Sequence, residues 1–359
     1  MILNSNTILR RVLALLVCSL TLLTADRAPA AKSGWIVPAR YLPVPTDISP
    51  QLYEILSELR RPNVERAKSD YPKTKAEWKE LVGSQRGNMA GYMHYYAKEM
   101  SVKISKEKIA GVPVYRITPD TITPEHRKHL FLYIHGGAYV FGSGEAGLPE
   151  AIMIAHRIGI PVLSVDYRTA PKDPYPAAIE DMVAVYRSLL KTQPADSIAL
   201  GGTSSGGGLA LAAIHKYKRL GLPLPGALYA GTPWSDLSKT GDSYTINEGI
   251  DHKLIAYDGF IEAAAKLYAN GSNLKDPLLS PVYGSFKNFP PTYLVTGTRD
   301  LFLSNTIRVH RKLREVGVEA DLNVYEGFSH VEYLVAKDSP EAKEIYRELG
   351  IFLRRHLSR

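Results

Sequence analysis

Cysteine is almost absent from this chain of 359 residues, which contains a single one, Cys18. One cysteine excludes an internal disulfide and a CxxC metal site. Cys18 also lies within an apolar N-terminal segment, where a cysteine nucleophile is not expected. The use of cysteine therefore does not indicate a redox compartment.

Long runs of one residue type are also missing. No block of five or more like charges occurs, although 44 basic and 36 acidic residues give a formal net charge of +8. Basic and acidic residues are interleaved, as in Lys73-Thr74-Lys75-Ala76-Glu77. Interleaving is typical of a solvated surface, so we expect no nucleic-acid partner. No period of 20 to 50 residues repeats visibly, which disfavours a solenoid.

What remains is an ordinary globular composition, with 45% apolar and 22% charged residues. A chain of this length buries well over half of its unfolded surface and needs neither disulfides nor metal to fold. Disordered, collagenous, coiled-coil and multi-span membrane proteins are thereby excluded as interpretations of the whole chain.

The first 30 residues have the features of a secretory signal peptide. Arg10 and Arg11 precede an apolar stretch at 12–24, which is shorter than the roughly 20 residues that a spanning helix needs. Ala28-Pro29-Ala30 then provides small residues for cleavage. The sequence predicts a signal peptide at 1–30 and a periplasmic or secreted protein without a stable membrane span. An uncleaved N-terminal anchor is the alternative.

Residues 31–100 are first rich in proline and then helical in pattern. Ser49 is a suitable N-cap, with Pro50 at the first helical position. Further helical patterns occur around Trp78 and over 89–100, where core packing is the simplest role for the aromatic and methionine residues. The first of these helices is marked by apolar residues at helical spacing: Leu52, Ile55, Leu56 and Leu59.

From about residue 101, buried strand patterns alternate with helical patterns. Near-continuous apolar runs at 129–134, 160–165 and 197–200 are typical of strands buried on both faces. The alternation predicts a mainly parallel sheet covered on both faces by helices. It is interrupted over 235–287, which we interpret as an insertion that leaves the sheet and returns to it.

A candidate nucleophile lies in Gly202-Thr203-Ser204-Ser205-Gly206, which matches G-x-S-x-G between a strand pattern and a helical pattern. In that context the motif marks a nucleophile on a strained strand-to-helix turn. Residues two before and two after the nucleophile must be small, because strand and helix approach closely there. Ser204 has glycines at both positions, whereas Ser205 has Thr203 at one of them. The sequence therefore predicts Ser204.

A candidate oxyanion hole follows the strand that ends at Ile134, in His135-Gly136-Gly137-Ala138. Glycines at a strand end allow backbone N–H groups to face a pocket, where they stabilise developing negative charge. We predict that the N–H groups of Gly136, Gly137 and Ser205 form this site. Taken alone, the motif is equally well an ordinary glycine-rich turn.

A serine nucleophile requires a base and an orienting acid, in the chain order Ser, acid, His for this type of fold. His330 follows a late strand in the turn Gly327-Phe328-Ser329-His330, and Asp300 follows the strand pattern at 293–296. Both positions are strand ends at the same sheet edge, so we predict His330 as base and Asp300 as acid. The other downstream histidines lie in helical patterns or in the insertion: His215, His252, His310 and His356.

Three further stretches complete a recognisable pattern: Asp166-Tyr167-Arg168-Thr169-Ala170-Pro171 to Tyr175-Pro176-Ala177-Ala178, Asp276-Pro277-Leu278-Leu279-Ser280-Pro281, and Phe289-Pro290-Pro291. With the two glycine motifs, the chain from about residue 128 resembles the hormone-sensitive-lipase-like group of α/β-hydrolase esterases and lipases. The resemblance implies an α/β-hydrolase catalytic domain at 101–359. It also implies a helical cap formed by 31–100 and by the insertion at 235–287.

The sequence departs from the pattern of this group at two places. The group usually has GDSAG or GTSAG at the nucleophile, whereas Ser205 replaces the alanine here. The N–H of Ser205 still serves an oxyanion hole, but its hydroxyl has no assigned role. The group's final motif is often G-M-x-H-x-F, and here the polar Glu332 stands at the last position.

The resemblance and the candidate residues predict hydrolysis of a small-molecule ester through an acyl-enzyme, with no metal and no organic cofactor. Lactone or amide hydrolysis by the same residues is an alternative, and so is a non-catalytic binding protein on this scaffold. The cap sequence has no long apolar run of the kind that a membrane-surface lipase needs. We therefore expect short- to medium-chain esters. The sequence does not specify an oligomeric state.

Overall fold

The computed structural model describes residue 34 and the ranges 37–86 and 90–358. The chain divides into two compact units, 1–43 and 44–359. The described part of the first unit, 34 and 37–43, contains no helix or strand. The predicted signal peptide at 1–30 lies outside the described residues. No helix within the described ranges is long and apolar enough to cross a lipid bilayer.

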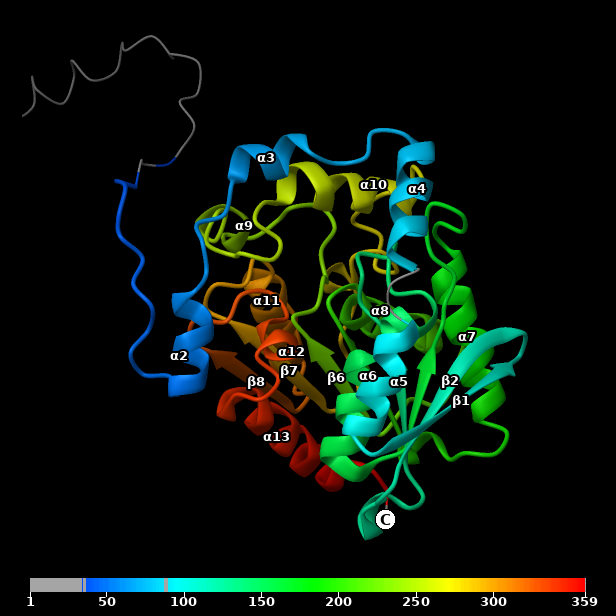
Figure 1. Ribbon diagram of the computed structural model, residues 1–359. Coiled ribbons are helices and arrows are strands. Elements are labelled where there is room, and N and C mark those ends of the chain that lie inside the picture. Colours follow the sequence, from blue (N-terminus) through cyan, green and yellow to red (C-terminus); the bar gives the residue numbers. More distant parts are fainter. Residues whose placement is uncertain (1–33, 35–36, 87–89, 359) are drawn as a thin grey trace, which may run out of the picture. The chain divides into compact units, whose positions relative to one another are not determined.

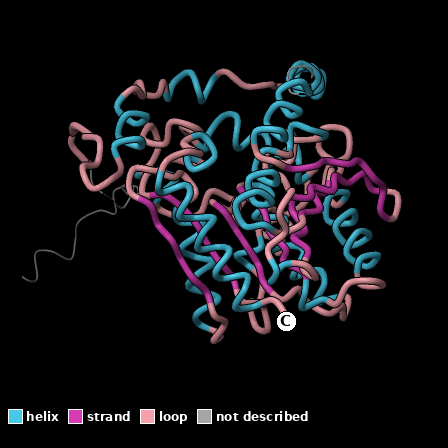
Figure 2. The backbone as a smooth tube through the Cα atoms, turned by 60° about the horizontal axis from the view of Figure 1, so that its bottom comes forward, coloured by secondary structure: helices cyan, strands magenta, loops and turns pink. Residues whose placement is uncertain are grey.

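The second unit is built on an eight-stranded sheet in the order β1-β2-β4-β3-β5-β6-β7-β8 (Figures 1 and 2). Strands β3 to β8 run parallel, while β1 and β2 pair antiparallel at one edge. The strands are β1 (Val102–Ile109), β2 (Val112–Pro119), β3 (Leu130–Ile134), β4 (Val162–Val165), β5 (Ile198–Thr203), β6 (Ala227–Gly231), β7 (Thr292–Gly297) and β8 (Ala320–Tyr325). The predicted α/β-hydrolase sheet is thus present.

Helices cover both faces of this sheet, as Figure 1 shows. The α-helices of the described residues are α2 (Pro50–Ser57), α3 (Val64–Ser69), α4 (Lys75–Arg86), α5 (Ala90–Glu99), α6 (Pro149–Ile154), α7 (Ala177–Leu189), α8 (Ser205–Arg219), α9 (Ser243–Ile246), α10 (Glu262–Ala269), α11 (Leu303–Glu315), α12 (Glu332–Val335) and α13 (Pro340–His356). Short 3-10 or π turns are η1 (Pro124–His126), η2 (Gly144–Gly147), η3 (Ala155–Gly159), η4 (Ala195–Ser197), η5 (Tyr257–Ile261) and η6 (Pro281–Tyr283).

The core is divided by the sheet, because side chains alternate between its faces along each strand. In β3, Leu130 and Leu132 belong to one apolar cluster, which includes residues of α7, α8 and α11, while Phe131 and Tyr133 belong to a second cluster, which includes residues of α5, α6 and α13. All five residues of β3 are buried. Burial on both faces explains why this strand has a continuous apolar pattern in the sequence.

Most predicted elements are confirmed, including the first helix. Ser49 caps α2 by accepting a hydrogen bond from the N–H of Leu52, and Pro50 is the first helical residue. Of the apolar run over 89–100, Tyr96 and Met100 belong to the core. Strand β1 was not predicted, because it lies at the sheet edge and the consecutive polar residues at 105–108 break its apolar alternation.

Two buried histidines make the stability of this fold sensitive to acid. Burial lowers the pKa of His126 to about 4, and nearby His129 contributes. Burial likewise lowers the pKa of His215 to about 4, although a hydrogen bond with the carbonyl of Pro281 opposes the shift. Both groups bind protons more readily when unfolded. The stabilising effect of the neutral rings is therefore lost as the pH falls from about 6.5 towards 4.

We expect the melting temperature to fall on acidification through this window. Because carboxylates titrate there too, the matched comparison is His215→Gln, whose amide retains a donor near the Nε2 position. The variant is expected to lose less stability than the parent protein between pH 6.5 and pH 4. Equal losses, measured by circular dichroism melts across that range, would contradict the assignment for His215.

Candidate active site

Ser204 sits on the sharp turn between β5 and α8, with φ 61° and ψ −125°. A non-glycine residue rarely adopts this conformation unless its surroundings impose it. Here three backbone hydrogen bonds do so: the N–H of Ser204 donates to Gly231, and its carbonyl accepts from Gly208 and Trp234. The turn therefore holds the Ser204 hydroxyl at the carboxyl edge of the sheet.

The glycines that flank this turn are required by close packing. A Cβ at Gly202 would overlap with the carbonyl oxygen of Ile134, and a Cβ at Gly206 would meet the same atom. Both positions thus lie against the end of β3. This is the steric reason for which the sequence favoured Ser204 over Ser205 as the nucleophile.

Ser204, Asp300 and His330 lie together although each is on a different loop, after β5, β7 and β8 respectively. Nε2 of His330 lies 2.9 Å from Oγ of Ser204, and Nδ1 lies 3.1 Å from Oδ1 of Asp300. Asp300 is fully buried, and His330 is only 3% exposed. The predicted serine, base and acid therefore form one continuous hydrogen-bonded chain.

The carboxylate of Asp300 is fixed by two further donors. Its Oδ2 accepts from the hydroxyl of Thr296 at 2.8 Å, and its Oδ1 accepts from the N–H of Phe302 at 2.8 Å. The ring of Phe302 packs edge-on against His330, with 4.9 Å between centroids. These contacts leave the imidazole one orientation, in which a carboxylate faces Nδ1 and the serine faces Nε2.

The predicted oxyanion residues lie beside Ser204. A Cβ at Gly136 would be 2.9 Å from the carbonyl oxygen of Thr203, and Gly137 has φ +112°, which favours glycine. Among the described residues, the N–H groups of Gly136, Gly137 and Ser205 have no hydrogen-bond acceptor. Unpaired N–H groups next to a nucleophile are available to an oxyanion.

The segment Asp166-Tyr167-Arg168 holds the glycine loop at 135–138 in place. Tyr167 stacks on His135 with 4.1 Å between ring centroids, and its hydroxyl donates to the carbonyl of His135 at 2.9 Å. Asp166 accepts from the N–H of Gly144 at 2.8 Å. Arg168 in turn pairs with the buried Asp181 of α7 at 2.8 Å. The motif is therefore a support for the oxyanion loop.

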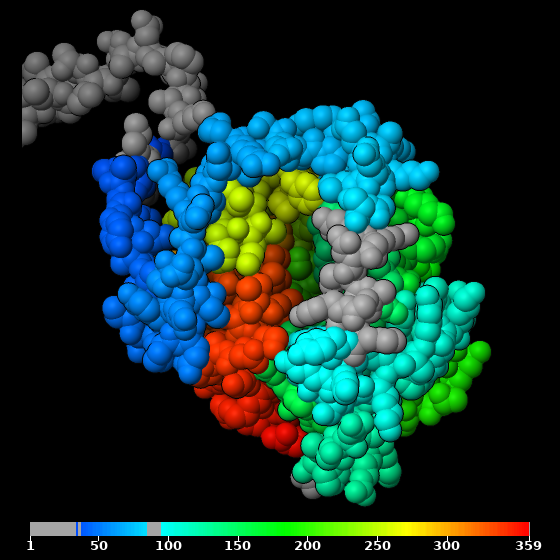
Figure 3. Space-filling model, in the orientation of Figure 1, coloured from blue at the N-terminus to red at the C-terminus, as the bar shows by residue number. Residues whose placement is uncertain are grey.

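A cavity of about 830 Å³ opens onto Ser204 and His330. Most of its wall is apolar, with side chains such as Val140, Phe141, Trp234, Phe260, Phe302 and Leu334. In the space-filling view the second unit is hollowed between the light-blue N-terminal segment, the yellow insertion and the orange C-terminal segment (Figure 3). Ala67 and Asp70 from the α3 segment line the cavity, and so do residues 253–256, Phe260 and Ile261 from the insertion. Parts of both segments that the resemblance assigns to a cap, within 44–100 and 235–287, thus line the cavity.

A buried polar cluster behind the nucleophile was not found from the sequence. Glu150 of α6 accepts hydrogen bonds from the hydroxyls of Tyr133, Thr203 and Tyr229, each at 2.8 Å. Tyr333 also contacts Thr203 at 2.8 Å. Burial raises the pKa of Glu150, although its hydroxyl donors oppose the shift. No local motif marks these residues, because they come together from five separate elements.

The hydroxyl of Ser205 does not face the cavity. The side chain of Ser205 is fully buried, and the residue is not part of the cavity wall. The departure from alanine at this position therefore leaves the site itself unchanged.

Replacing Ser205 with alanine is expected to leave kcat and KM within about twofold of the parent values, because its contribution comes from the backbone N–H. The matched substitution at Ser204 serves as the comparison. A loss of kcat of tenfold or more in Ser205→Ala, measured with an ester substrate on folded protein, would show that the hydroxyl participates.

Comparisons with known proteins agree with this geometry. A family model described as the alpha/beta hydrolase fold matches residues 131–334. An acetyl-hydrolase from Streptomyces hygroscopicus is 30% identical over 245 residues, which cover 68% of this chain and 81% of the relative. An esterase from Acinetobacter venetianus is 28% identical over 260 residues, 72% of this chain and 84% of the relative.

Solved structures give the same result. The crystal structure of an esterase is 46% identical, with a TM-score of 0.88, and covers 90% of this chain and 99% of that one. The crystal structure of an esterase from the bacterial hormone-sensitive lipase family is 31% identical, with a TM-score of 0.69, and covers 86% of this chain and 99% of that one.

Proposed function

The chain belongs to the α/β-hydrolase family and, within it, to the esterases of the hormone-sensitive-lipase type, and from this premise we propose that it hydrolyses carboxylic esters with Ser204 as nucleophile. The observation that carries the proposal is the hydrogen-bonded chain from Ser204 through His330 to Asp300 at the wall of an apolar cavity. The family relationship makes esters the expected substrates. The local geometry supports a role for each residue.

In the first half of the reaction, Oγ of Ser204 attacks the ester carbonyl while Nε2 of His330 accepts its proton. Asp300 holds the imidazole in the required tautomer and stabilises the imidazolium. Negative charge on the carbonyl oxygen is accepted by the N–H groups of Gly136, Gly137 and Ser205, each contributing about 3 kcal/mol to the transition state. His330 then gives its proton to the leaving alcohol, which leaves an acyl group on Ser204.

In the second half, a water molecule takes the place of the alcohol. His330 accepts a proton from the water, the resulting hydroxide attacks the acyl carbon, and the same N–H groups stabilise the second oxyanion. Collapse of this intermediate releases the acid and returns the proton to Ser204. The proton transfers to and from Ser204 run between two atoms, Oγ and Nε2, that already lie within hydrogen-bond distance.

The cavity supports short- to medium-chain acyl groups as substrates. A volume of about 830 Å³ with mostly apolar walls accommodates a small-molecule ester. The experiment that tests the function is hydrolysis of p-nitrophenyl esters over a series of acyl lengths by the purified protein. Activity that is highest on short or medium chains supports the proposal. Folded protein without activity on any length would contradict it and would favour lactone hydrolysis or a binding role.

A further inference from the structure

We propose that Asp251, on the insertion at 235–287, is a positioning residue that fixes the loops bearing Asp300 and His330 and ties both to the cavity wall. The inference rests on the proposed function of these two residues. It concerns a carboxylate that makes no contact with Ser204. The sequence analysis assigned Asp251 no role.

One oxygen of this carboxylate bridges the acid loop and the histidine loop. Oδ2 of Asp251 accepts from the N–H of Leu301 at 2.7 Å and from the N–H of His330 at 3.3 Å. Leu301 directly follows Asp300, so each loop is held next to its functional side chain. The two loops follow different strands, β7 and β8. Oδ2 of Asp251 joins them next to Asp300 and His330, beyond the bond from the N–H of Arg299 to the carbonyl of Phe328 further along the loops.

The other oxygen organises a turn that forms part of the cavity wall. Oδ1 accepts from the N–H of Lys253 at 2.8 Å and from the N–H of Leu254 at 3.1 Å. The carbonyl of Asp251 also accepts from Ile255 at 3.1 Å. Residues 253 to 256 line the cavity that opens onto Ser204. The substrate wall and the loops of the base and acid therefore share one carboxylate.

The next residue adds a second attachment to the histidine loop. Nδ1 of His252 lies 2.7 Å from the hydroxyl of Ser329, and its Nε2 lies 3.0 Å from Oε2 of Glu332. Ser329 and Glu332 are both buried, on either side of His330. Glu332, the polar departure from the family pattern, is thus a partner of the insertion rather than part of the cavity wall.

Burying a carboxylate in this position costs free energy unless hydrogen-bond donors compensate for the lost hydration. Asp251 is fully buried, and both burial and the neighbouring Asp300 raise its pKa, while its N–H donors lower it. Replacement by asparagine keeps the size of the side chain but turns one oxygen into an N–H donor. Whichever way the amide faces, one pair of backbone donors loses its acceptor.

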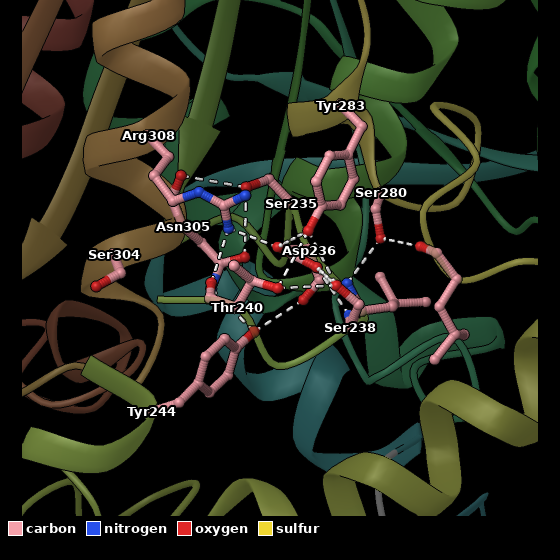
Figure 4. Close-up of polar contacts among 12 residues, drawn as sticks. Ser235, Asp236, Ser238, Thr240, Tyr244, Ser280, Tyr283, Ser304, Asn305 and Arg308 are labelled. Carbon is pink, nitrogen blue, oxygen red and sulfur yellow. Dashed lines mark hydrogen bonds and ion pairs between the residues drawn. The ribbon is translucent and has the colours of Figure 1, made fainter. Parts of the chain in front are cut away.

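The same insertion provides a matched control in Asp236, which Figure 4 shows in its own polar network. Asp236 is also fully buried and accepts from the N–H and hydroxyl of Ser238, from Tyr283 and from Arg308. None of these partners carries or adjoins Ser204, Asp300 or His330. Asp236→Asn therefore makes the same chemical change, at the same burial, away from the loops of the base and acid.

The test compares steady-state hydrolysis of a p-nitrophenyl ester by the parent protein, Asp251→Asn and Asp236→Asn, each at a temperature where circular dichroism shows it folded. We expect Asp251→Asn to lower kcat about 10- to 100-fold with KM within twofold, because small misplacements of reacting groups have effects of this size. Asp236→Asn is expected to lower the melting temperature and to keep kcat within about twofold.

Equal losses of kcat in both variants, or an unchanged kcat in Asp251→Asn, would overturn the proposal while leaving the esterase function in place. An inactive parent protein would instead contradict the function itself. If Asp251→Asn does not fold, Asp251→Glu decides, because it keeps the charge and both acceptor oxygens but moves them by one methylene group from the N–H groups of Leu301 and His330. A several-fold fall in kcat at constant KM supports positioning by Asp251, and an unchanged kcat overturns it.

Discussion

Replacing Ser204 with alanine is expected to lower kcat for ester hydrolysis by roughly 10⁴- to 10⁶-fold, the range found when a serine nucleophile is removed. The reason is that in the proposed mechanism His330 activates the Oγ of Ser204, which lies 2.9 Å from its Nε2. Residual catalysis would come from the oxyanion donors and from substrate binding, which the substitution leaves in place. The measurement is the initial rate with a p-nitrophenyl ester at saturating substrate.

The fold of the Ser204→Ala variant is expected to survive, because alanine occupies the same strained backbone position. Its melting temperature should therefore stay close to that of the parent protein. Ser205→Ala is the matched control, one residue away and with full activity expected. Comparable rates for the two variants, both far below that of the parent, would show that the loss does not report on the nucleophile.

The second large effect is expected from Gly202→Ala. A Cβ at this position would overlap with the carbonyl oxygen of Ile134 and lie 3.0 Å from the carbonyl carbon of Gly206. All of these are backbone atoms, which cannot rotate out of the way as a side chain can. We expect a destabilisation of about 3 kcal/mol or more, since overpacking of a buried site costs 1–3 kcal/mol even when side chains are able to move. Chemical denaturation with urea measures the change.

Gly83→Ala is the control for this substitution. Gly83 lies within α4, and a Cβ there would have no atom within 4 Å. The same added methyl group is expected to raise stability by up to about 1 kcal/mol, because alanine favours a helix. A Gly202→Ala protein as stable as the parent would contradict the packing that we describe between β5, α8 and the end of β3.

The sequence predicted those features in which local pattern and local geometry coincide. The parallel strands β3 to β7 are buried on both faces, so their apolar runs identify them without knowledge of their neighbours. The turn at Ser204 is constrained by glycines two positions away on each side, and this spacing is visible in the chain itself. His330 and Asp300 could be predicted from the sequence because they follow strands whose ends share one edge of the sheet.

Features that depend on distant partners could not be predicted. Helix α6 was not predicted, and neither was the cluster of hydroxyl groups around its residue Glu150. A single buried carboxylate has no distinctive local pattern. The relation between Asp251 and His330 is also invisible in the sequence, since 79 residues separate them. The sequence also does not show which way the side chains of Ser205 and Glu332 face, because tertiary packing decides their orientation.

The measurement that tests the central claim most directly is covalent labelling with a fluorophosphonate, followed by intact mass and peptide mapping. The account predicts one adduct per chain on Ser204, a much slower reaction in His330→Ala and no adduct in Ser204→Ala, because the reagent needs the activated hydroxyl. Folded protein that remains unlabelled would contradict the claim. Labelling of Ser204→Ala at the rate of the parent protein would also contradict it.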